Sequence, residues 1–367
     1  MLRTFAILVL LGSSLMANPD LESAMTKGVD FLVGHQNKDG SWGGPTRTKG
    51  LNIFAPLPDG HQAFHTASSA LALHGLLESR DQRPDTLKSI ARGEQWLLEV
   101  LPKTRSINPK ATYNIWAHAY GLRALASLYR YHDDPEKRKV YKEQALTQIA
   151  KLKRYEDING GFGYLDFKQN TVRPSGMPTS FTTATALLGM HDAASTMDLE
   201  LPPRLIKTCI RCIQEQRNAD FTYVYAREHR RRPRLPINRA AGSLGRSQVC
   251  NAALRKFDDT AVTDDVIRTF LQRLVDRQGW LDHGRKRPVP HEAPAAVAGY
   301  FYYYGHYYAS ECIHILPKEE QGPWKEKLAA ILIPKQEKNG SWWDYPLYNY
   351  HYAYGTGYML STLARCR

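Results

Sequence analysis

Cysteine is scarce in this chain, with five residues among 367. That number is too small for a disulfide scaffold of this length, and because it is odd, at least one thiol is unpaired. Cys209 and Cys212 stand one helical turn apart, while Cys250, Cys312 and Cys366 are scattered. We interpret them mainly as small core residues, since free cysteine is often buried.

Long hydrophobic runs are equally rare. The apolar stretch from Phe5 to Leu11, with Leu15, follows Arg3 and precedes the small residue Ala17. It is shorter than the roughly 20 residues that span a bilayer, and its layout is typical of a secretory signal peptide. Residues 1–17 therefore predict export to the periplasm or the medium, with cleavage near Ala17. An uncleaved anchor or a misread first helix is the alternative, and no later segment predicts a membrane span.

Acidic residues are also in the minority, 36 against 49 lysines and arginines, which gives a net charge of +13. The densest basic run is 227–234, with Arg230, Arg231, Arg232 and Arg234. Such a run can bind nucleic acid, but the predicted export argues against that partner. We expect a solvated loop, with contact to an anionic surface outside the cytoplasm as the alternative.

The chain contains an internal repeat. An aromatic residue beside glycine recurs near Gly40, Gly160, Gly279 and Gly340, at spacings of about 60 residues or twice that. Weaker copies lie at 92–97 and 214–221. The repeat predicts six units in one domain.

Each unit consists of a charged amphipathic segment, a loop rich in glycine or proline, and a segment of small and apolar residues. The charged type is seen at 138–143 and 325–327, and the small-residue type at 66–73, 119–126, 183–188 and 357–364. A helix of the second type is expected to be buried on most sides. The pattern predicts an all-α protein, an α/α toroid with inner and outer helix layers, although an open solenoid is an alternative. The domain is expected to span 18–367, with units at 20–80, 88–132, 140–196, 201–257, 263–316 and 324–366.

One of the repeats has a recognisable motif. Residues 27–36 read basic-Gly-x-x-aromatic-Leu-x-x-x-Gln and are followed by Gly40-Ser41-Trp42. Residues 331–336 with 340–342 match its second half, 92–97 match its first, and 209–214 are a worn copy. The chain thus resembles the squalene cyclase and protein prenyltransferase superfamily, which implies a terpenoid cyclase-like toroid. The glutamine is expected to bond exposed backbone at a helix end, and the tryptophan to pack on the outer helix of the next repeat.

The catalytic motifs of that superfamily are missing. No Asp-x-Asp-Asp run is present, and the pairs at 258–259 and 264–265 are expected to cap the following helix. The zinc-binding Asp-x-Cys element is also absent. The resemblance therefore implies a fold and leaves the reaction open, and we predict neither a cofactor nor a metal.

In such a ring, the loops before the inner helices and the first inner turns surround one mouth of a central cavity. We expect a ligand-binding rim there, since His or Tyr recurs at matching places in three repeats, although each His can instead serve as a cap or packing residue. The candidates are His61, His65, Trp116, His118, Arg246, Tyr304, His306, His351 and Tyr354, with further tyrosines at Tyr113, Tyr120, Tyr302, Tyr303, Tyr350 and Tyr352.

Three functions are compatible with these residues. The first is binding of a small apolar or isoprenoid-like ligand in the cavity, although isoprenoid diphosphates are cytoplasmic and the chain is predicted to be exported. The second is a carbohydrate-active lyase or hydrolase acting on a saccharide through the Tyr, His and Arg246 set, since inner-loop carboxylates are sparse: Asp59, Asp282, Glu292 and Asp344. The third is a non-catalytic extracellular interaction module.

Overall fold

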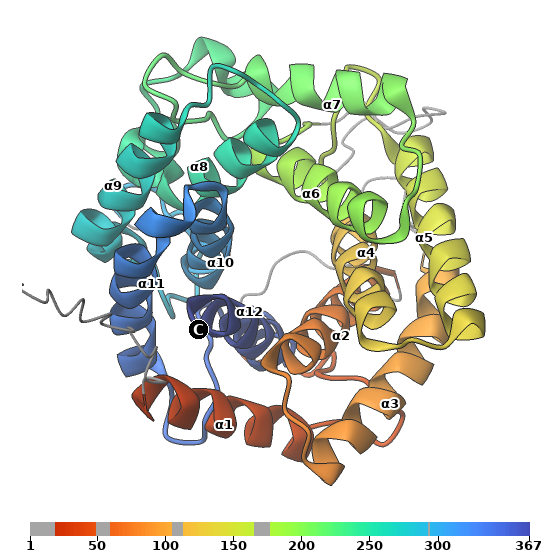
Figure 1. Cartoon of the computed structure of the whole chain (residues 1–367). Helices are drawn as coiled ribbons and strands as arrows, with labels where there is room; N and C mark the ends of the chain where they lie inside the picture. The colour runs from red at the N-terminus through yellow and green to blue at the C-terminus, as the bar shows by residue number, and fades with distance from the viewer. Residues whose placement is uncertain (1–18, 49–58, 105–112, 165–176, 293) are drawn as a thin grey trace, which may run out of the picture.

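The computed structural model describes residues 19–48, 59–104, 113–164, 177–292 and 294–367, so the predicted signal peptide lies outside the described residues. Within those ranges the chain forms twelve α-helices, a few short 3-10 turns and isolated β-bridges. The helices alternate between an outer and an inner layer (Figure 1). The predicted α/α toroid is confirmed.

The outer helices are α1 (Pro19–Gly34), α3 (Pro84–Val100), α5 (Pro135–Tyr155), α7 (Pro203–Gln214), α9 (Asp264–Asp282) and α11 (Lys318–Leu332). The inner helices are α2 (Asp59–Ser79), α4 (Asn114–Tyr131), α6 (Ser180–Met197), α8 (Ala240–Lys256), α10 (Phe301–Ile315) and α12 (His351–Cys366).

The inner helices form a closed ring, because each packs against the next and α12 packs back against α2. Small residues allow this close approach. A Cβ on Gly75 of α2 would lie 2.8 Å from the carbonyl oxygen of Gly357 on α12, and a Cβ on Gly189 of α6 would lie 2.6 Å from that of Ala119 on α4. Such separations exclude a larger side chain. The Ala, Gly and Ser content of the inner segments therefore sets the diameter of the ring.

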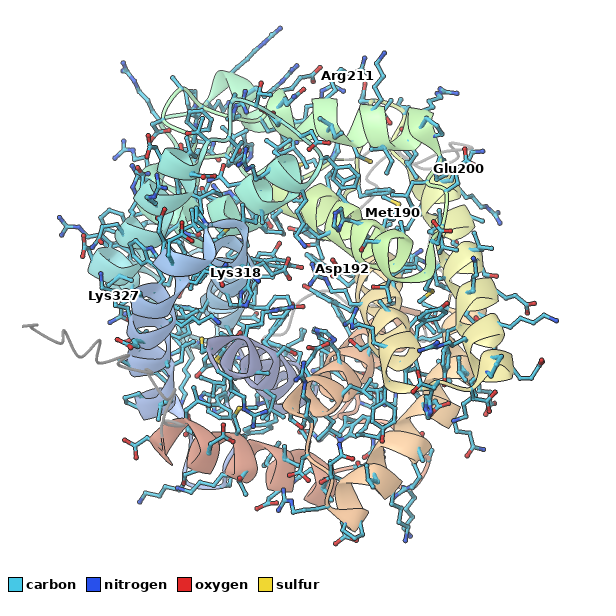
Figure 2. All side chains as sticks on the ribbon, in the orientation of Figure 1. Met190, Asp192, Glu200, Arg211, Lys318 and Lys327 are labelled. Atoms are coloured by element: carbon cyan, nitrogen blue, oxygen red, sulfur yellow. The ribbon has the colours of Figure 1, made fainter. Side chains whose placement is uncertain are left out.

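The outer helices begin at residues that favour a helix N-terminus, and their outer faces are exposed to solvent. Proline occupies the first turn of α3, α5 and α7, where its missing N–H costs nothing. The hydroxyl of Thr263 caps α9, and Asp264 and Asp265 lie in its first turn. Acidic side chains stabilise a helix start, so Asp264 and Asp265 have a structural role, but the cap is Thr263 and not an aspartate as predicted. Asp259 accepts from the Ala261 N–H and pairs with Arg217, so the pair at 258–259 does not cap α9 either. Arg211 and Lys327 point outward from the ring (Figure 2).

The repeat motif ties neighbouring hairpins together. Gln36 Nε2 donates to the carbonyl oxygens of Gly40 and of Ser89 on α3, both at 2.9 Å. Trp42 Nε1 donates to the Leu32 carbonyl oxygen at 2.8 Å, and its ring lies against Gly93 of α3. The first hairpin is thereby attached to the second through a carbonyl inside α3, while the Trp42 bond satisfies a carbonyl in the last turn of α1.

The last copy of the motif closes the ring. Gln336 Nε2 donates to the Gly340 carbonyl oxygen at 2.9 Å and to that of Ala24 on α1 at 2.8 Å. The ring of Trp342 lies on Gly28 of α1, whose added Cβ would be 2.8 Å from Trp342 Cζ3. Residues more than 300 positions apart in sequence are joined here. A bond pattern repeated along the chain therefore also joins its two ends.

Two further expectations bear on the environment of the chain. All five cysteines are free thiols, and all except Cys366 are buried, in agreement with their interpretation as core residues. Among the described helices, none is long and apolar enough to cross a membrane.

Candidate functional site: a central aromatic cavity

A cavity of about 380 Å³ occupies the ring at the side where the inner helices begin. Residues from the first halves of α2, α4, α6, α10 and α12 form much of its wall, with contributions from the adjoining loops. The wall consists of Phe64, Ala67, Ser68, Leu71, Tyr113, Trp116, Tyr120, Tyr164, Phe181, Tyr225, Pro290, His291, Tyr300, Phe301, Tyr304, Leu347, Tyr350, Tyr354 and Tyr358. None of these described residues is acidic.

Helical periodicity brings the aromatic rings to one face. Residues four positions apart lie above one another on a helix, as do Trp116 and Tyr120 on α4, whose rings stack at 6.1 Å. Trp116 also stacks on Phe181 of α6 at 6.1 Å. Aromatic pairs of this kind contribute about 0.5–1.5 kcal/mol each beyond area burial. The wall is thus a continuous packed surface across neighbouring helices.

Many wall hydroxyls are bonded to each other or to neighbouring hydroxyls. Tyr120 bonds to Tyr358 and Tyr164 bonds to Tyr225, in both cases hydroxyl to hydroxyl. The Tyr304 hydroxyl lies 2.8 Å from the hydroxyl of Thr185. Burial raises the pKa of each of these tyrosines well above its usual value, so they are neutral at physiological pH.

Other wall hydroxyls bond to titratable groups behind or beside the wall. The Tyr350 hydroxyl lies 3.1 Å from His61 Nδ1, and that of Tyr300 lies 3.0 Å from His291 Nε2. The Tyr354 hydroxyl donates to Asp344 Oδ1 at 2.7 Å. With these hydroxyls engaged, the wall presents mainly ring faces and aliphatic carbon to the cavity.

Asp344 is a fully buried carboxyl group one hydrogen bond behind the wall. Its Oδ2 accepts from the backbone N–H of Tyr303 at 3.0 Å. Burial raises the pKa of Asp344 to about 7, because a carboxylate loses hydration in the interior and here forms no ion pair within the described residues to replace it.

Of the nine predicted rim residues, Trp116, Tyr304 and Tyr354 line the cavity. His61 and His65 lie on α2 beside the Tyr350 ring, which is 6.1 and 5.9 Å from them, and neither lines the cavity. Burial lowers the pKa of both.

Three of the predicted histidines lie off the cavity face of their helices. His118 Nδ1 lies 2.8 Å from Gln148 Oε1 on α5, and His306 Nδ1 bonds to the Tyr302 carbonyl at 2.7 Å. His351 packs on Trp343. Burial lowers the pKa of each histidine to about 4. Two helix positions correspond to a rotation of about 200°, so His118 faces away from the cavity that Trp116 and Tyr120 line.

Arg246 is likewise buried outside the cavity wall. Its guanidinium donates to the carbonyl oxygens of Tyr223 at 3.0 Å and Gly242 at 2.7 Å, and to that of Ile237. Burial lowers its pKa to about 10, so it remains a cation. The side chain thus holds the loop before α8 in place.

Three of the further tyrosines named from the sequence, Tyr113, Tyr120 and Tyr350, also line the cavity. Sequence reasoning missed Tyr300 and Tyr358. A spacing of four residues, from Tyr300 to Tyr304 and from Tyr354 to Tyr358, was a usable signal for both, since it predicts one helix face. Tyr164 and Tyr225 lie in loops between helices, where no periodicity identifies them.

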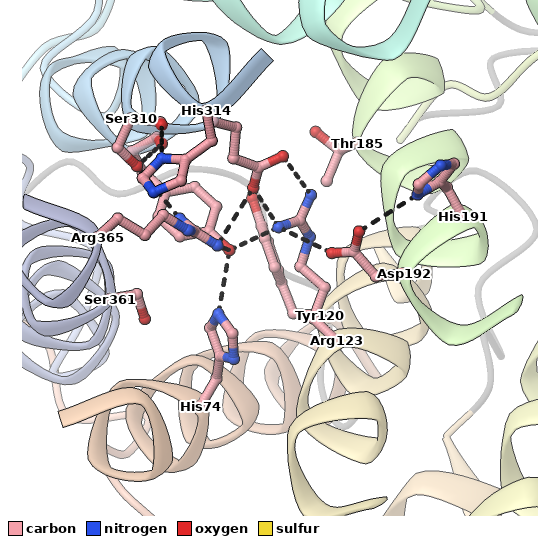
Figure 3. A network of polar contacts seen from close by, with 12 residues as sticks. His74, Tyr120, Arg123, Thr185, His191, Asp192, Ser310, His314, Ser361 and Arg365 are labelled. Atoms are coloured by element: carbon pink, nitrogen blue, oxygen red, sulfur yellow. Dashed lines mark hydrogen bonds and ion pairs between the residues drawn. The ribbon is translucent and has the colours of Figure 1, made fainter. Parts of the chain in front are cut away.

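The opposite end of the ring contains a buried ionic cluster (Figure 3). Arg123 is 1% exposed and pairs with Glu311, and its Nη1 lies 3.2 Å from Asp192 Oδ2 and 2.7 Å from the Tyr307 hydroxyl. Arg365 Nη2 lies 3.5 Å from Glu311 Oε1. Burial opposes ionisation of Glu311, but Arg123 and Arg365 outweigh it and hold the pKa of Glu311 low. A second cavity of about 300 Å³ adjoins this cluster.

The basic run at 227–234 begins in a short 3-10 turn. Arg227 and Arg230 pair with Glu215 at 3.1 and 3.0 Å, while Arg231, Arg232 and Arg234 are exposed. The described residues contain no group of three or more His, Cys, Asp or Glu side chains placed to hold a metal ion.

No protein-family model and no curated protein sequence matches this chain. Solved structures do match along nearly its whole length. The type II terpene cyclase MstE from Scytonema is 11% identical with a TM-score of 0.53, and the match covers 94% of this chain and 97% of the cyclase. The fold is shared. The toroid is also similar to an unsaturated glucuronyl hydrolase specific for heparin, at 10% identity and a TM-score of 0.60 over 94% of this chain and 96% of the hydrolase.

A third similar structure contains a saccharide. It is an inactive variant of an α-1,6-mannanase from Salegentibacter in complex with α-1,6-mannotriose, 10% identical with a TM-score of 0.55, and the match covers 94% of this chain and 99% of the mannanase. At such low identities the likeness establishes the toroid fold and does not identify the reaction. The class of ligand must therefore be inferred from the residues that line the cavity.

Proposed function

We propose that this chain is an exported toroid protein that binds an apolar, isoprenoid-like ligand in its central cavity. The observation that supports this most is the bonding of the wall hydroxyls, since Tyr120, Tyr164, Tyr304 and their partners leave ring faces toward the cavity. Transfer of apolar surface from water onto such a wall contributes about 25 cal/mol per Å². The cavity also argues against a filled interaction scaffold.

A saccharide ligand is the alternative, because toroids of this shape include enzymes named for glycans. Most glycoside hydrolases use a pair of carboxyl groups that flank the scissile bond. The described cavity wall has no carboxyl group, and Asp344 lies behind it without a second carboxyl opposite. A sugar would also leave many hydroxyl groups without partners against this wall, which is costly. The wall therefore favours the apolar ligand.

The test is direct binding by titration calorimetry and thermal shift, with farnesol as the apolar probe and α-1,6-mannotriose and a heparin disaccharide as saccharide probes. Farnesol at 100 times its Kd should stabilise the protein by about 2.7 kcal/mol, while the saccharides should not change the melting temperature. Saturable saccharide binding without farnesol binding would contradict the proposal.

A pair of variants identifies the binding place. Ser68→Phe puts a ring into the cavity from α2 and should weaken farnesol binding at least about tenfold. Leu146→Phe, on the outside of α5 where the side chain is 45% exposed, should leave binding unchanged. Equal affinities in the two variants would place the ligand elsewhere.

Export is tested separately from binding. Mass spectrometry of the protein recovered from its native host should show a mature chain that begins at Asn18 and is found outside the cytoplasm. An intact N-terminus on cytoplasmic protein would contradict the export part of the proposal.

A further inference from the structure

Two polar pairs in the cavity wall have no role in binding an apolar molecule. One is Tyr354 with the buried Asp344, and the other is Tyr300 with His291. Hydrogen bonding lowers the cost of burying these polar groups, and perturbed titratable groups in a cavity are candidates for a reactive site. Each pair can act on a molecule in the cavity in a different way.

The Asp344 pair is a hydrogen-bond donor directed at the cavity. Tyr354 lines the cavity, and its hydroxyl is 2.7 Å from Asp344 Oδ1. When Asp344 holds a proton, it can donate that proton to the Tyr354 oxygen. The Tyr354 O–H then has the Tyr345 carbonyl oxygen as its acceptor at 3.3 Å, a long bond that a ligand atom can replace. Burial without an ion pair favours this protonated form. The pair is thus suited to stabilise a developing negative charge on oxygen.

The His291 pair can accept a proton, whereas the Asp344 pair donates one. The reason is that the tautomer of His291 is fixed. His291 Nδ1 lies 2.9 Å from the Ala296 carbonyl oxygen, which can only accept, so Nδ1 carries the proton. Nε2 of the neutral ring is therefore an acceptor, and the Tyr300 hydroxyl donates to it at 3.0 Å. Both side chains line the cavity. The Tyr300 hydroxyl can thus pass its own proton to His291 in the same step in which its oxygen takes up another, so that the imidazole is the base and the hydroxyl is the relay.

The backbone around His291 is held in an unfavourable conformation. His291 has φ +66° and Ala296 has φ +53°, a region that non-glycine residues rarely adopt. Strain of this kind concentrates at functional sites, where the surrounding structure imposes it. Here it accompanies the contact that directs the imidazole at Tyr300.

The two pairs lie next to each other along the wall. Tyr345 lies between them, since its ring is 5.3 Å from that of Tyr300 and its carbonyl oxygen is 3.3 Å from the Tyr354 hydroxyl. One bound molecule can therefore contact both tyrosines, as catalysis by a positioned acid and base requires.

We propose that the cavity catalyses removal of a proton next to the carbonyl group of an apolar ketone, with Tyr354 as the donor to the carbonyl oxygen and Tyr300 as the proton acceptor. The α C–H bond breaks, its electron pair forms a C=C bond, and the carbonyl π electrons move to the oxygen that Tyr354 bonds. In the same step Tyr300 takes the proton and passes its own to His291 Nε2, so the negative charge of the enolate is matched by an imidazolium. Return of a proton to the same carbon restores the ketone, and return to a conjugated carbon shifts a double bond. This inference rests on the proposed binding of an apolar ligand.

The test uses 2-tetralone, an apolar cyclic ketone, and follows exchange of its α protons in D2O by NMR. The full chain should accelerate exchange above the buffer rate. Tyr354→Phe and Tyr300→Phe should each slow it at least about 100-fold. Tyr141→Phe is the matched control, because Tyr141 is a buried tyrosine of outer helix α5 that does not line the cavity. Its hydroxyl donates to the Glu94 carboxylate on α3 at 2.6 Å. The exchange rate of this variant should equal that of the parent.

Calorimetry with 2-tetralone and farnesol separates binding from catalysis. Bound 2-tetralone with exchange at the buffer rate would overturn this inference and leave the proposed binding intact. No binding of either probe would refute the proposed function, and this inference with it. Equal loss of exchange in Tyr141→Phe would attribute the effect to folding and would also overturn the assignment.

Asp344 and His291 act through the tyrosines, so their test is the pH profile. Burial raises the pKa of Asp344 to about 7, and burial lowers that of His291, so exchange should fall above about pH 7 and also at acid pH. Asp344→Asn should remove the alkaline decline and His291→Gln the acid one. If Asp344 and His291 were only structural, their variants would lower the exchange rate at every pH and would leave both declines in the pH profile where they are. The groups that face Asp344 are Arg285, Tyr302, Tyr303 and Tyr354, and those that face His291 are Arg246, Tyr225 and Tyr300.

Discussion

Substitution of Gly93 by alanine tests whether the repeat motif requires direct contact between an indole ring and a bare helix backbone. A Cβ on Gly93 would lie 2.7 Å from Trp42 Cη2 and 2.8 Å from Cζ3. Trp42 is 1% exposed and is held by its bond to Leu32, so the ring cannot move aside easily. Overpacking of this kind costs about 1–3 kcal/mol, against a gain of up to about 1 kcal/mol in helix propensity.

Gly279→Ala supplies the control, since Gly279 lies on outer helix α9 and a Cβ there meets nothing within 4 Å. Its effect should be stabilisation by up to about 1 kcal/mol. Urea unfolding should therefore place Gly93→Ala about 1–3 kcal/mol below Gly279→Ala, and Trp42→Phe should reduce that gap by removing the clashing atoms. The reasoning is refuted if both glycine variants are equally stable.

Three more outcomes follow from buried polar groups, each measured by urea unfolding. Arg123→Met leaves Glu311 buried without its main cation and should cost about 3–5 kcal/mol, whereas a loss below 1 kcal/mol would show that the pair is unimportant. Gln336→Leu removes two bonds, including the one to Ala24, and should cost about 2 kcal/mol; an unchanged midpoint would contradict its role in ring closure. His118 has its pKa lowered to about 4 by burial, so the unfolded chain binds the proton first and stability should fall as pH drops from 6.5 to 4. His118→Gln should flatten that decline, and an unchanged slope would exclude His118 as its source.

The fold was predictable because its determinants are local and repeated. Each outer helix begins with sequence signals that act within one turn, such as the proline at the start of α3. The motif from Gly28 to Trp42 and its copy at 336–342 mark the same contact in different hairpins. Periodicity therefore revealed both layers of helices before any contact was known.

The cavity was only partly predictable because it depends on which side of each inner helix faces the ring centre. His118 and Trp116 are two residues apart, yet the first contacts α5 and the second lines the cavity. These helices are buried on nearly all sides, so hydrophobicity does not distinguish the inner side from the outer side. Arg246 illustrates the same difficulty, since its partners are carbonyl oxygens from a loop.

The arrangement of parallel inner helices explains why the two ends of the ring differ chemically. Helix N-termini carry a partial positive charge and C-termini a partial negative one. Arg123, Arg130, Lys256 and Arg365 gather where the inner helices end, together with the carboxylates of Glu78, Asp192 and Glu311, and the partial negative charge of the helix ends adds to the stabilisation of these cations. At the other end, Tyr300 and its counterparts precede inner helices without forming side-chain caps, but at α10 the Asp344 carboxyl group accepts from the Tyr303 N–H in the first turn. At the start of α10, this carboxyl group therefore takes the place that a helix N-terminus offers to an acceptor oxygen.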